Sequence, residues 1–106
     1  SVNRQLDSAA RFINMHARAG VATENIHVAI VVHGPAAADL LATDDNASAP
    51  LITALIEAGA TITLCGQTAA YRDIAASDLI EGVTLSLSAM TAHALLQQQG
   101  YTLNPF

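Results

Sequence analysis

The sequence has one cysteine, no lysine and no long apolar run, and each shortage excludes a class of protein. One cysteine cannot form an internal disulfide or a site built on several thiolates, so the thiol of Cys65 is free or pairs with another molecule. The longest apolar stretch, residues 28–32, is far shorter than the roughly 20 residues that cross a bilayer, so no membrane span is expected. The net charge of −5 repels a phosphate backbone, which makes nucleic acid an unexpected partner.

The chain is short and carries little charge. Its 106 residues fit one domain, residues 1–106, since domains commonly hold roughly 100 to 150 residues. Charged residues make up 12% of the sequence, against roughly 25% in an average soluble domain. We therefore expect a soluble domain with part of its uncharged surface covered by other subunits. Arg4, Arg11 and Arg18 recur every seven residues, which predicts a solvated stripe along one helix.

The first half of the chain alternates helix and strand patterns. Residues 6–17 place apolar side chains at the three-and-four spacing of an amphipathic helix, and Gly20 supplies its end. Residues 26–32 form a nearly continuous β-branched run, typical of a strand buried on both faces. Gly34 and Pro35 end that strand, and residues 36–41 predict a short helix.

The second half continues the alternation. A helix begins near Pro50 and closes at Gly59, and residues 60–65 predict the next strand. Residues 67–71 favour a helical turn, residues 83–87 a third strand, and Ser88 caps a helix over 89–99. Residues 101–103 predict a short closing strand.

This alternation predicts an α/β domain with a mainly parallel sheet. Right-handed crossovers place helices on both sides of such a sheet, which gives a three-layer α/β/α sandwich. A helix that opens a chain of this kind normally returns from an earlier strand. We therefore expect that an N-terminal strand precedes residue 1 or has been cut away.

The candidate site lies where the predicted strands end. In open parallel sheets, ligands bind beyond the carboxyl ends of the strands, where the N-termini of the helices also point. The residues that follow the three predicted strands are His33, Gly34, Cys65, Gly66, Gln67 and Ser88.

Cys65 is the candidate catalytic residue of this set. Its sulfur is predicted to face a glycine turn and the amides of a following helix, whose partial positive charge favours an anion. Helix N-termini lower the pKa of a cysteine from about 8.5 toward neutrality, and the thiolate is the form that attacks sulfur or electrophiles. Gly66 would let a substrate approach the backbone closely.

Other interpretations of these residues stay open. Cys65 also suits a small apolar residue that ends a buried strand. His33 would hydrogen-bond or deprotonate the thiol if their strands are neighbours, and otherwise serves as a capping or packing residue. A metal site from Cys65, His33 and His93 lacks any close ligand pair, so no metal is predicted. No nucleotide-binding or hydrolase motif occurs, and no cofactor is predicted.

Several short motifs together resemble the DsrE/DsrF-like family, over nearly the whole chain. They are R-F-I-N-M-H at 11–16, V-H-G-P-A at 32–36, L-C-G-Q at 64–67, S-A-M-T at 88–91 and Q-G-Y at 99–101. The resemblance implies a three-layer α/β/α fold and assembly as trimers or hexamers of related subunits. It also implies sulfur relay, in which a cysteine accepts sulfur as a persulfide and passes it to a partner protein, and Cys65 is the only residue here that suits this role.

The leading hypothesis is thus a sulfur carrier, or sulfurtransferase, with Cys65 as acceptor and with His33 and Gln67 lining its pocket. The sequence names neither the sulfur donor nor the acceptor. The rival hypothesis is a noncatalytic oligomeric module that binds a small ligand or senses redox state and holds a structural cysteine. A free thiol favours the cytoplasm, and the periplasm stays open if an upstream leader is removed.

Overall fold

The protein, seen here as a computed structural model that describes residues 2–103, is built on a parallel sheet. The strand order is β1-β2-β3, with both neighbouring pairs parallel. The strands are β1 (Ala29–Val32), β2 (Thr61–Cys65) and β3 (Thr84–Ser86). The register pairs Val32 with Leu64 and Cys65 with Ser86, so the carboxyl ends of the three strands lie at one edge.

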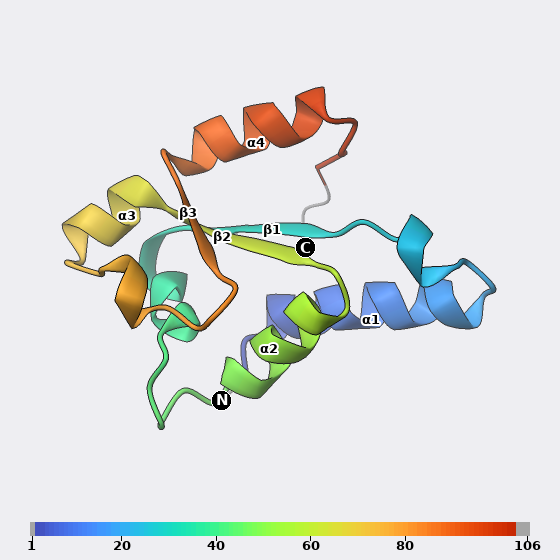
Figure 1. The fold of residues 1–106 in the computed structure, drawn as a ribbon, viewed down its shortest axis with the longest axis horizontal. Coiled ribbons are helices and arrows are strands. Elements are labelled where there is room, and N and C mark those ends of the chain that lie inside the picture. The colour runs from blue at the N-terminus through green and yellow to red at the C-terminus, as the bar shows by residue number, and fades with distance from the viewer. Residues whose placement is uncertain (1, 104–106) are drawn as a thin grey trace.

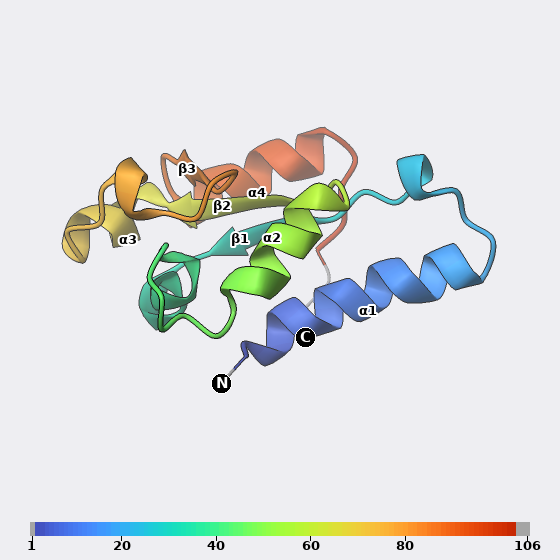
Figure 2. The ribbon, with the colours of Figure 1, turned by 60° about the horizontal axis from the view of Figure 1, so that its bottom comes forward.

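Helices cover both faces of the sheet. The α-helices are α1 (Arg4–Arg18), α2 (Ala49–Glu57), α3 (Gly66–Tyr71) and α4 (Ala89–Gln98), and the 3₁₀ turns are η1 (Thr23–Asn25), η2 (Gly34–Leu40) and η3 (Ala76–Asp78). Helix α4 lies on one face and α1 and α2 lie on the other (Figures 1 and 2). The predicted three-layer α/β/α fold is therefore confirmed. Within residues 2–103, no helix has both the length and the apolar character needed to cross a membrane.

Helix α1 shows how local sequence sets an element. The side chain of Asn3 caps its first turn by accepting hydrogen bonds from the backbone N–H groups of Gln5 (2.9 Å) and Leu6 (3.3 Å). Leu6 and Ala9 are buried, whereas the predicted arginine stripe is exposed. Its one ion pair joins Arg11 to Asp7 at 3.2 Å, an exposed (i, i+4) contact that contributes little stability.

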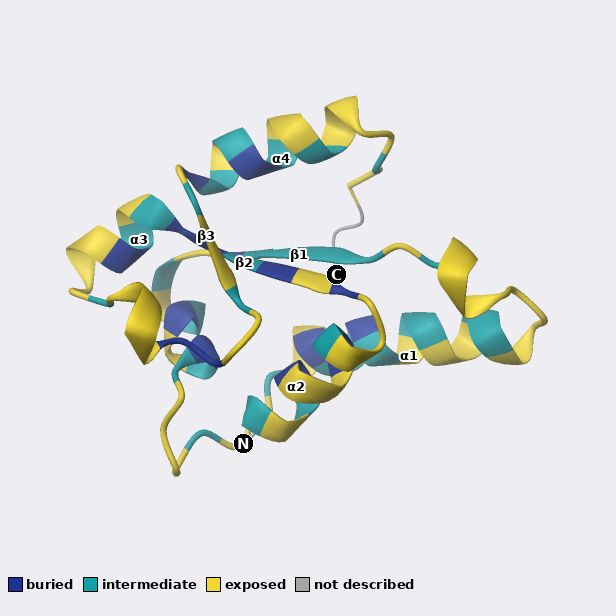
Figure 3. Ribbon diagram, viewed as in Figure 1, coloured by how far each residue is buried: buried dark blue, intermediate teal, exposed yellow. Residues whose placement is uncertain are grey.

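The core lies between the sheet and the layer that holds α2 and η2. Alternate side chains of β2, Ile62 and Leu64, are fully buried and belong to one apolar cluster with Leu40, Ile52 and Leu55. Burial is concentrated in β2, the central strand, while β1 is only partly covered (Figure 3). The prediction that the first strand is buried on both faces is therefore wrong for this structure.

The first strand and the predicted closing strand also differ from the sequence prediction. The first strand begins at Ala29 rather than at residue 26, because its pairing with β2 begins with Ala29 opposite Thr61. Residues 101–103 form no strand, since no neighbouring strand pairs with them within the described chain. β-branched or aromatic composition does not suffice for a strand when the hydrogen-bonding partner is missing.

Candidate functional site

A pocket of about 550 Å³ opens at the carboxyl edge of the sheet, and we call it the Cys65 pocket. Its lining brings together five of the six residues that the sequence singled out: His33, Gly34, Cys65, Gln67 and Ser88. Ala89 and Met90, which follow Ser88 at the end of the third strand, and His93 also line it. The lining further includes residues that sequence reasoning did not assign to this site, namely Thr68, Tyr71 and Arg72.

Parallel pairing places the predicted residues side by side. His33 directly follows Val32, which pairs with Leu64, so His33 and Cys65 leave adjacent strands at the same level. Ser88 follows β3 two residues after Ser86, the partner of Cys65. Both His33 and Cys65 line the pocket, but no hydrogen bond joins them in the described part of the chain.

The sulfur of Cys65 lies among backbone donors. The residue is 5% exposed and precedes the first residue of α3. The backbone N–H of Thr68 has the largest influence and lowers the pKa of the thiol below its ordinary value of 9.0. Burial acts in the opposite direction, but the N–H groups of Ala89 and Gln67 and the hydroxyl of Thr68 lower the pKa further, and the net shift is downward.

Thr68 connects two strand ends through its hydroxyl. The backbone N–H of Gly34 donates a hydrogen bond to Thr68 Oγ1 at 3.1 Å. The oxygen thus accepts from Gly34, and its own proton is free to point at the sulfur of Cys65, where the hydroxyl lowers the thiol pKa. The sequence held a signal for this residue, because a hydroxyl at the third position of a helix lies next to the N-cap residue.

Gly66 does not line the pocket, contrary to the prediction that its missing side chain admits a substrate. A Cβ at this position would overlap the backbone carbonyl oxygen of Ser86 and approach that of Leu87 to 3.1 Å. The glycine therefore lets the start of α3 pack tightly against the end of β3. This contact fixes the direction in which Cys65 leaves the sheet.

Ser88 acts as the predicted cap of α4. Its Oγ accepts a hydrogen bond from the backbone N–H of Thr91 at 3.0 Å and lies 2.9 Å from Thr91 Oγ1. The residue is 7% exposed, so its hydroxyl is committed to the helix rather than to solvent. By starting α4 here, Ser88 places the N–H of Ala89 where it acts on the Cys65 sulfur.

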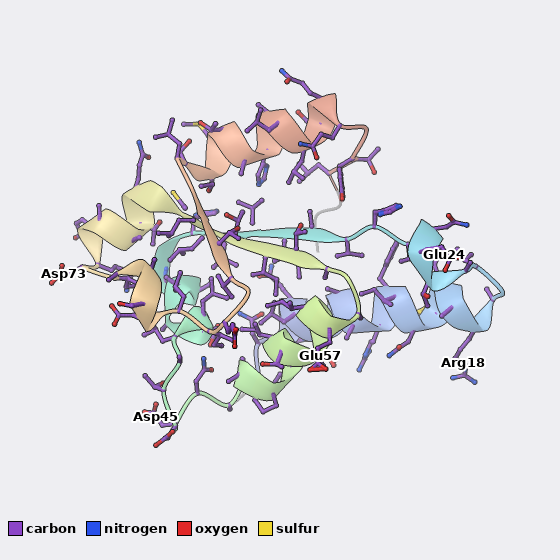
Figure 4. All side chains as sticks on the ribbon, in the orientation of Figure 1. Arg18, Glu24, Asp45, Glu57 and Asp73 are labelled. Atoms are coloured by element: carbon purple, nitrogen blue, oxygen red, sulfur yellow. The ribbon has the colours of Figure 1, made fainter. Side chains whose placement is uncertain are left out.

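The titratable side chains around the thiol are two histidines, a tyrosine and an arginine, and the lining holds no carboxylate. Arg72 is exposed and forms no ion pair within residues 2–103. Charged residues elsewhere, such as Arg18 and Asp73, point outward from the domain (Figure 4). The pocket is therefore positively biased in a protein of net charge −5. In the described chain, no cluster of three or more histidine, cysteine or acidic side chains could hold a metal ion.

Comparison with known proteins agrees with this architecture. No curated protein matches the chain. A protein of unknown function from Methanobacterium thermoautotrophicum, MTH1491, has a similar structure, with a TM-score of 0.71 and 18% sequence identity over 92% of this chain and 86% of that chain. At this identity the likeness concerns the fold alone. The profile of the DsrE/DsrF-like family matches residues 2–105, so nearly the entire sequence carries its pattern. The chain therefore belongs to the DsrE/DsrF-like family.

Proposed function

We propose that this protein is a sulfur carrier that holds a sulfur atom as a persulfide on Cys65. The observation that supports the proposal most strongly is the thiol itself: it ends a parallel strand, opens onto a pocket and is surrounded by backbone N–H groups that favour its anion. A thiolate is the nucleophile required for sulfur transfer. Membership of a family associated with sulfur relay agrees with this chemistry.

The transfer balances with thiol groups alone. The Cys65 thiolate attacks the terminal sulfur of a donor persulfide, R–S–SH, so that a new S–S bond forms and the donor S–S bond breaks. The donor thiolate leaves with the electron pair. In the second half, an acceptor thiolate attacks the outer sulfur and the Cys65 thiolate leaves, stabilised by the same amides that lowered its pKa.

The charge of the Cys65 pocket supports an anionic cargo. A bound persulfide is acidic and its outer sulfur extends from Sγ into the pocket, where Arg72, His33 and His93 are the basic neighbours. An unpaired guanidinium attracts an approaching anion and leaves it solvent-accessible for the next transfer. Carboxylates, which would repel both the thiolate and a negatively charged donor, are missing from the lining.

Apolar side chains at the rim of the pocket support a protein partner. Tyr71 and Met90 line the pocket yet are 88% and 80% exposed, and Leu87, directly before the cap residue Ser88, is 79% exposed. Exposed apolar groups that gather around a site are typical of interaction surfaces. Assembly as a trimer or hexamer, and the identity of the donor and acceptor, remain predictions that a light-scattering mass and donor screening would test.

Sulfur loading tests the proposal directly. The native protein is incubated with a small-molecule persulfide, excess donor is removed, and intact mass is recorded. We expect a gain of one sulfur atom that is lost on addition of a thiol reductant and does not occur in Cys65→Ser. Peptide mapping should place the added sulfur on Cys65. A wild-type protein that gains no sulfur, while a known carrier loads under the same conditions, would refute the proposal.

The rival function, an oligomeric module with an inert cysteine, is favoured by one observation, the 5% exposure of Cys65. Free cysteines are among the most buried residue types. The two functions differ in thiol accessibility in the folded state: a carrier is alkylated as a native protein, whereas an inert thiol reacts only after unfolding.

A further inference from the structure

A proton donor near the leaving sulfur would speed sulfur transfer to Cys65, because the donor departs as a thiolate. The more basic that thiolate is, the more slowly it leaves. Attack on a sulfur proceeds in line, so the leaving sulfur sits beyond the transferred atom, about 4 Å from the Cys65 sulfur and inside the Cys65 pocket. A group that gives it a proton must therefore line this pocket.

Four titratable side chains line the pocket beside the thiol: those of His33, Tyr71, Arg72 and His93. Arginine does not release its proton in proteins, and a tyrosine hydroxyl keeps its proton at neutral pH. Histidine both releases and takes up a proton near neutral pH. Neither histidine side chain is engaged in a hydrogen bond or an ion pair within residues 2–103, so either imidazole is free to act on a sulfur.

His93 is placed closer to the sulfur chemistry than His33. It lies one helical turn after Ala89 on α4, and residues four apart share a helix face. Side chains of a helix lean back toward its N-terminus, so the imidazole of His93 lies over the turn of Ala89, whose N–H acts on the Cys65 sulfur. His93 is also partly buried, whereas His33 is exposed. The sheltered histidine is therefore the better candidate for proton transfer within the pocket.

The far side of His93 holds no carboxylate that would fix it as a cation. There it lines a larger hollow along β1, together with His27, Asp39 and Tyr101. The carboxylate of Asp39 already accepts a hydrogen bond from the side chain of Asn3 at 2.7 Å. No ion pair joins Asp39 to His93 in the described chain, so the imidazole can change its protonation state during a reaction.

We propose that His93 carries the proton of sulfur transfer, an inference that rests on the proposed sulfur-carrier function. As the imidazolium, it gives its proton to the donor thiolate while the S–S bond of the donor breaks, so the donor leaves as a neutral thiol. The imidazole then takes the proton of the new persulfide group, –S–SH, on Cys65. The persulfide anion remains, His93 is again an imidazolium, and no oxidant or reductant is consumed.

The rate at which Cys65 opens two disulfides tests this role without any persulfide. Dithiobis(nitrobenzoate) and dithiodipropionate each carry two carboxylates, but the first releases a weakly basic aromatic thiolate and the second a basic alkyl thiolate. In His93→Gln, the rate with the alkyl disulfide should fall at least about tenfold, and the rate with the aromatic disulfide should change by less than about twofold. His33→Gln, the matched variant at the exposed histidine, should leave the ratio of the two rates unchanged.

A solvent isotope measurement needs no variant. In wild type, the ratio of the alkyl to the aromatic rate should be about twofold lower in heavy water, because only the alkyl thiolate leaves with a proton. The proposal is overturned if this ratio does not change, if His93→Gln slows both disulfides equally or neither, if His33→Gln shifts the ratio as much as His93→Gln, or if wild type reacts with neither disulfide.

Persulfide loading separates this proposal from the function on which it rests. His93→Gln should gain the same one sulfur atom as wild type from an alkyl persulfide, but at least about tenfold more slowly. If wild type gains no sulfur, the sulfur carrier is refuted, while the two disulfide rates still decide whether His93 gives a proton to the leaving thiolate.

Discussion

Two hollows of this domain share His33 and His93 but differ in whether the backbone groups that line them have hydrogen-bonding partners. In the Cys65 pocket, backbone N–H groups from two helices converge on one sulfur, and the neighbouring Ser88 and Thr68 hydroxyls already have partners. The second hollow, a groove of about 910 Å³ lined by residues 27–33, follows the edge of β1 that has no partner strand in the described chain. The first hollow is preorganised for chemistry, whereas the second follows a strand edge that is left unpaired within residues 2–103.

The Cys65 pocket is built by the carboxyl ends of the strands and by the starts of α3 and α4, and it adjoins the groove at His33 and His93. The predictions below vary one feature of the pocket at a time.

The largest effect is expected from Gly66→Ala. The added Cβ collides with the backbone carbonyl of Ser86, which cannot move without breaking the end of β3. We expect a loss of about 2 kcal/mol in unfolding free energy and a slower reaction of Cys65 with alkylating agents. Denaturant titration and alkylation kinetics measure both.

The control for that variant is Gly20→Ala. Gly20 has φ of +99° but no atom within 4 Å of its Cβ position, so alanine causes local strain and no collision. Stability should fall by about 1 kcal/mol with an unchanged alkylation rate. Equal effects of the two variants on the thiol would show that the close contact at Gly66 does not shape the pocket.

Thr68→Val tests the hydroxyl next to the sulfur. The variant keeps the backbone N–H of residue 68, which has the larger influence on the Cys65 pKa. It loses the hydroxyl, which also lowers that pKa and accepts a hydrogen bond from the N–H of Gly34. Alkylation at pH 7 should slow by about fivefold, which corresponds to roughly 1 kcal/mol. Thr68→Ser retains the hydroxyl and should react like wild type. If Thr68→Ser reacted as slowly as Thr68→Val, the slower alkylation would be due to altered packing and not to the lost hydroxyl.

Arg72→Gln tests the positive bias of the pocket. The rate ratio for a negatively charged alkylating agent over a neutral one, iodoacetate over iodoacetamide, should fall by roughly two- to threefold, since Arg72 is exposed and partly screened. Arg18→Gln removes the same charge at the far end of α1 and should leave the ratio unchanged. A similar drop in both variants would reflect net charge alone.

The smallest effect concerns stability and pH. Because the folded pKa of Cys65 lies below its ordinary value of 9.0, the native state binds fewer protons than the unfolded state between these two pKa values. The unfolding free energy of wild type should therefore rise relative to Cys65→Ser as pH increases through this window, and the gain should vanish as pH falls through the folded pKa. Denaturant titrations of both proteins at several pH values measure this difference. If burial instead raised the pKa of Cys65, the unfolding free energy of wild type would fall relative to Cys65→Ser as pH increases.

Much of the fold was predictable because its signals are local. Apolar periodicity predicted α1 and α2, and β-branched runs flanked by glycine predicted β1 and β2. The start of β1 and the absence of a strand at 101–103 were not predictable, since both depend on a partner strand. Composition cannot report whether that partner is in place.

The residues of the candidate site likewise divide into those that local sequence signals predict and those that only packing reveals. Cys65, Gln67 and Ser88 were found because each sits at a strand-to-helix junction that the sequence marks with glycine or a capping residue. Arg72 ends α3 and His93 lies in the second turn of α4, and only the packing of these helices reveals that both line the pocket. The role of Gly66 was predicted wrongly because a glycine that admits a ligand and one that admits a neighbouring carbonyl look identical in sequence.

The most direct test of the account is the pH dependence of Cys65 alkylation in the folded protein, followed by intact mass with iodoacetamide. We predict labelling of the folded protein at pH 7 and a half-maximal rate below pH 9.0, the ordinary thiol pKa. A thiol that stays unlabelled until the protein is unfolded, or whose reactivity appears only above that pH, would contradict the claim that Cys65 is an accessible, stabilised thiolate.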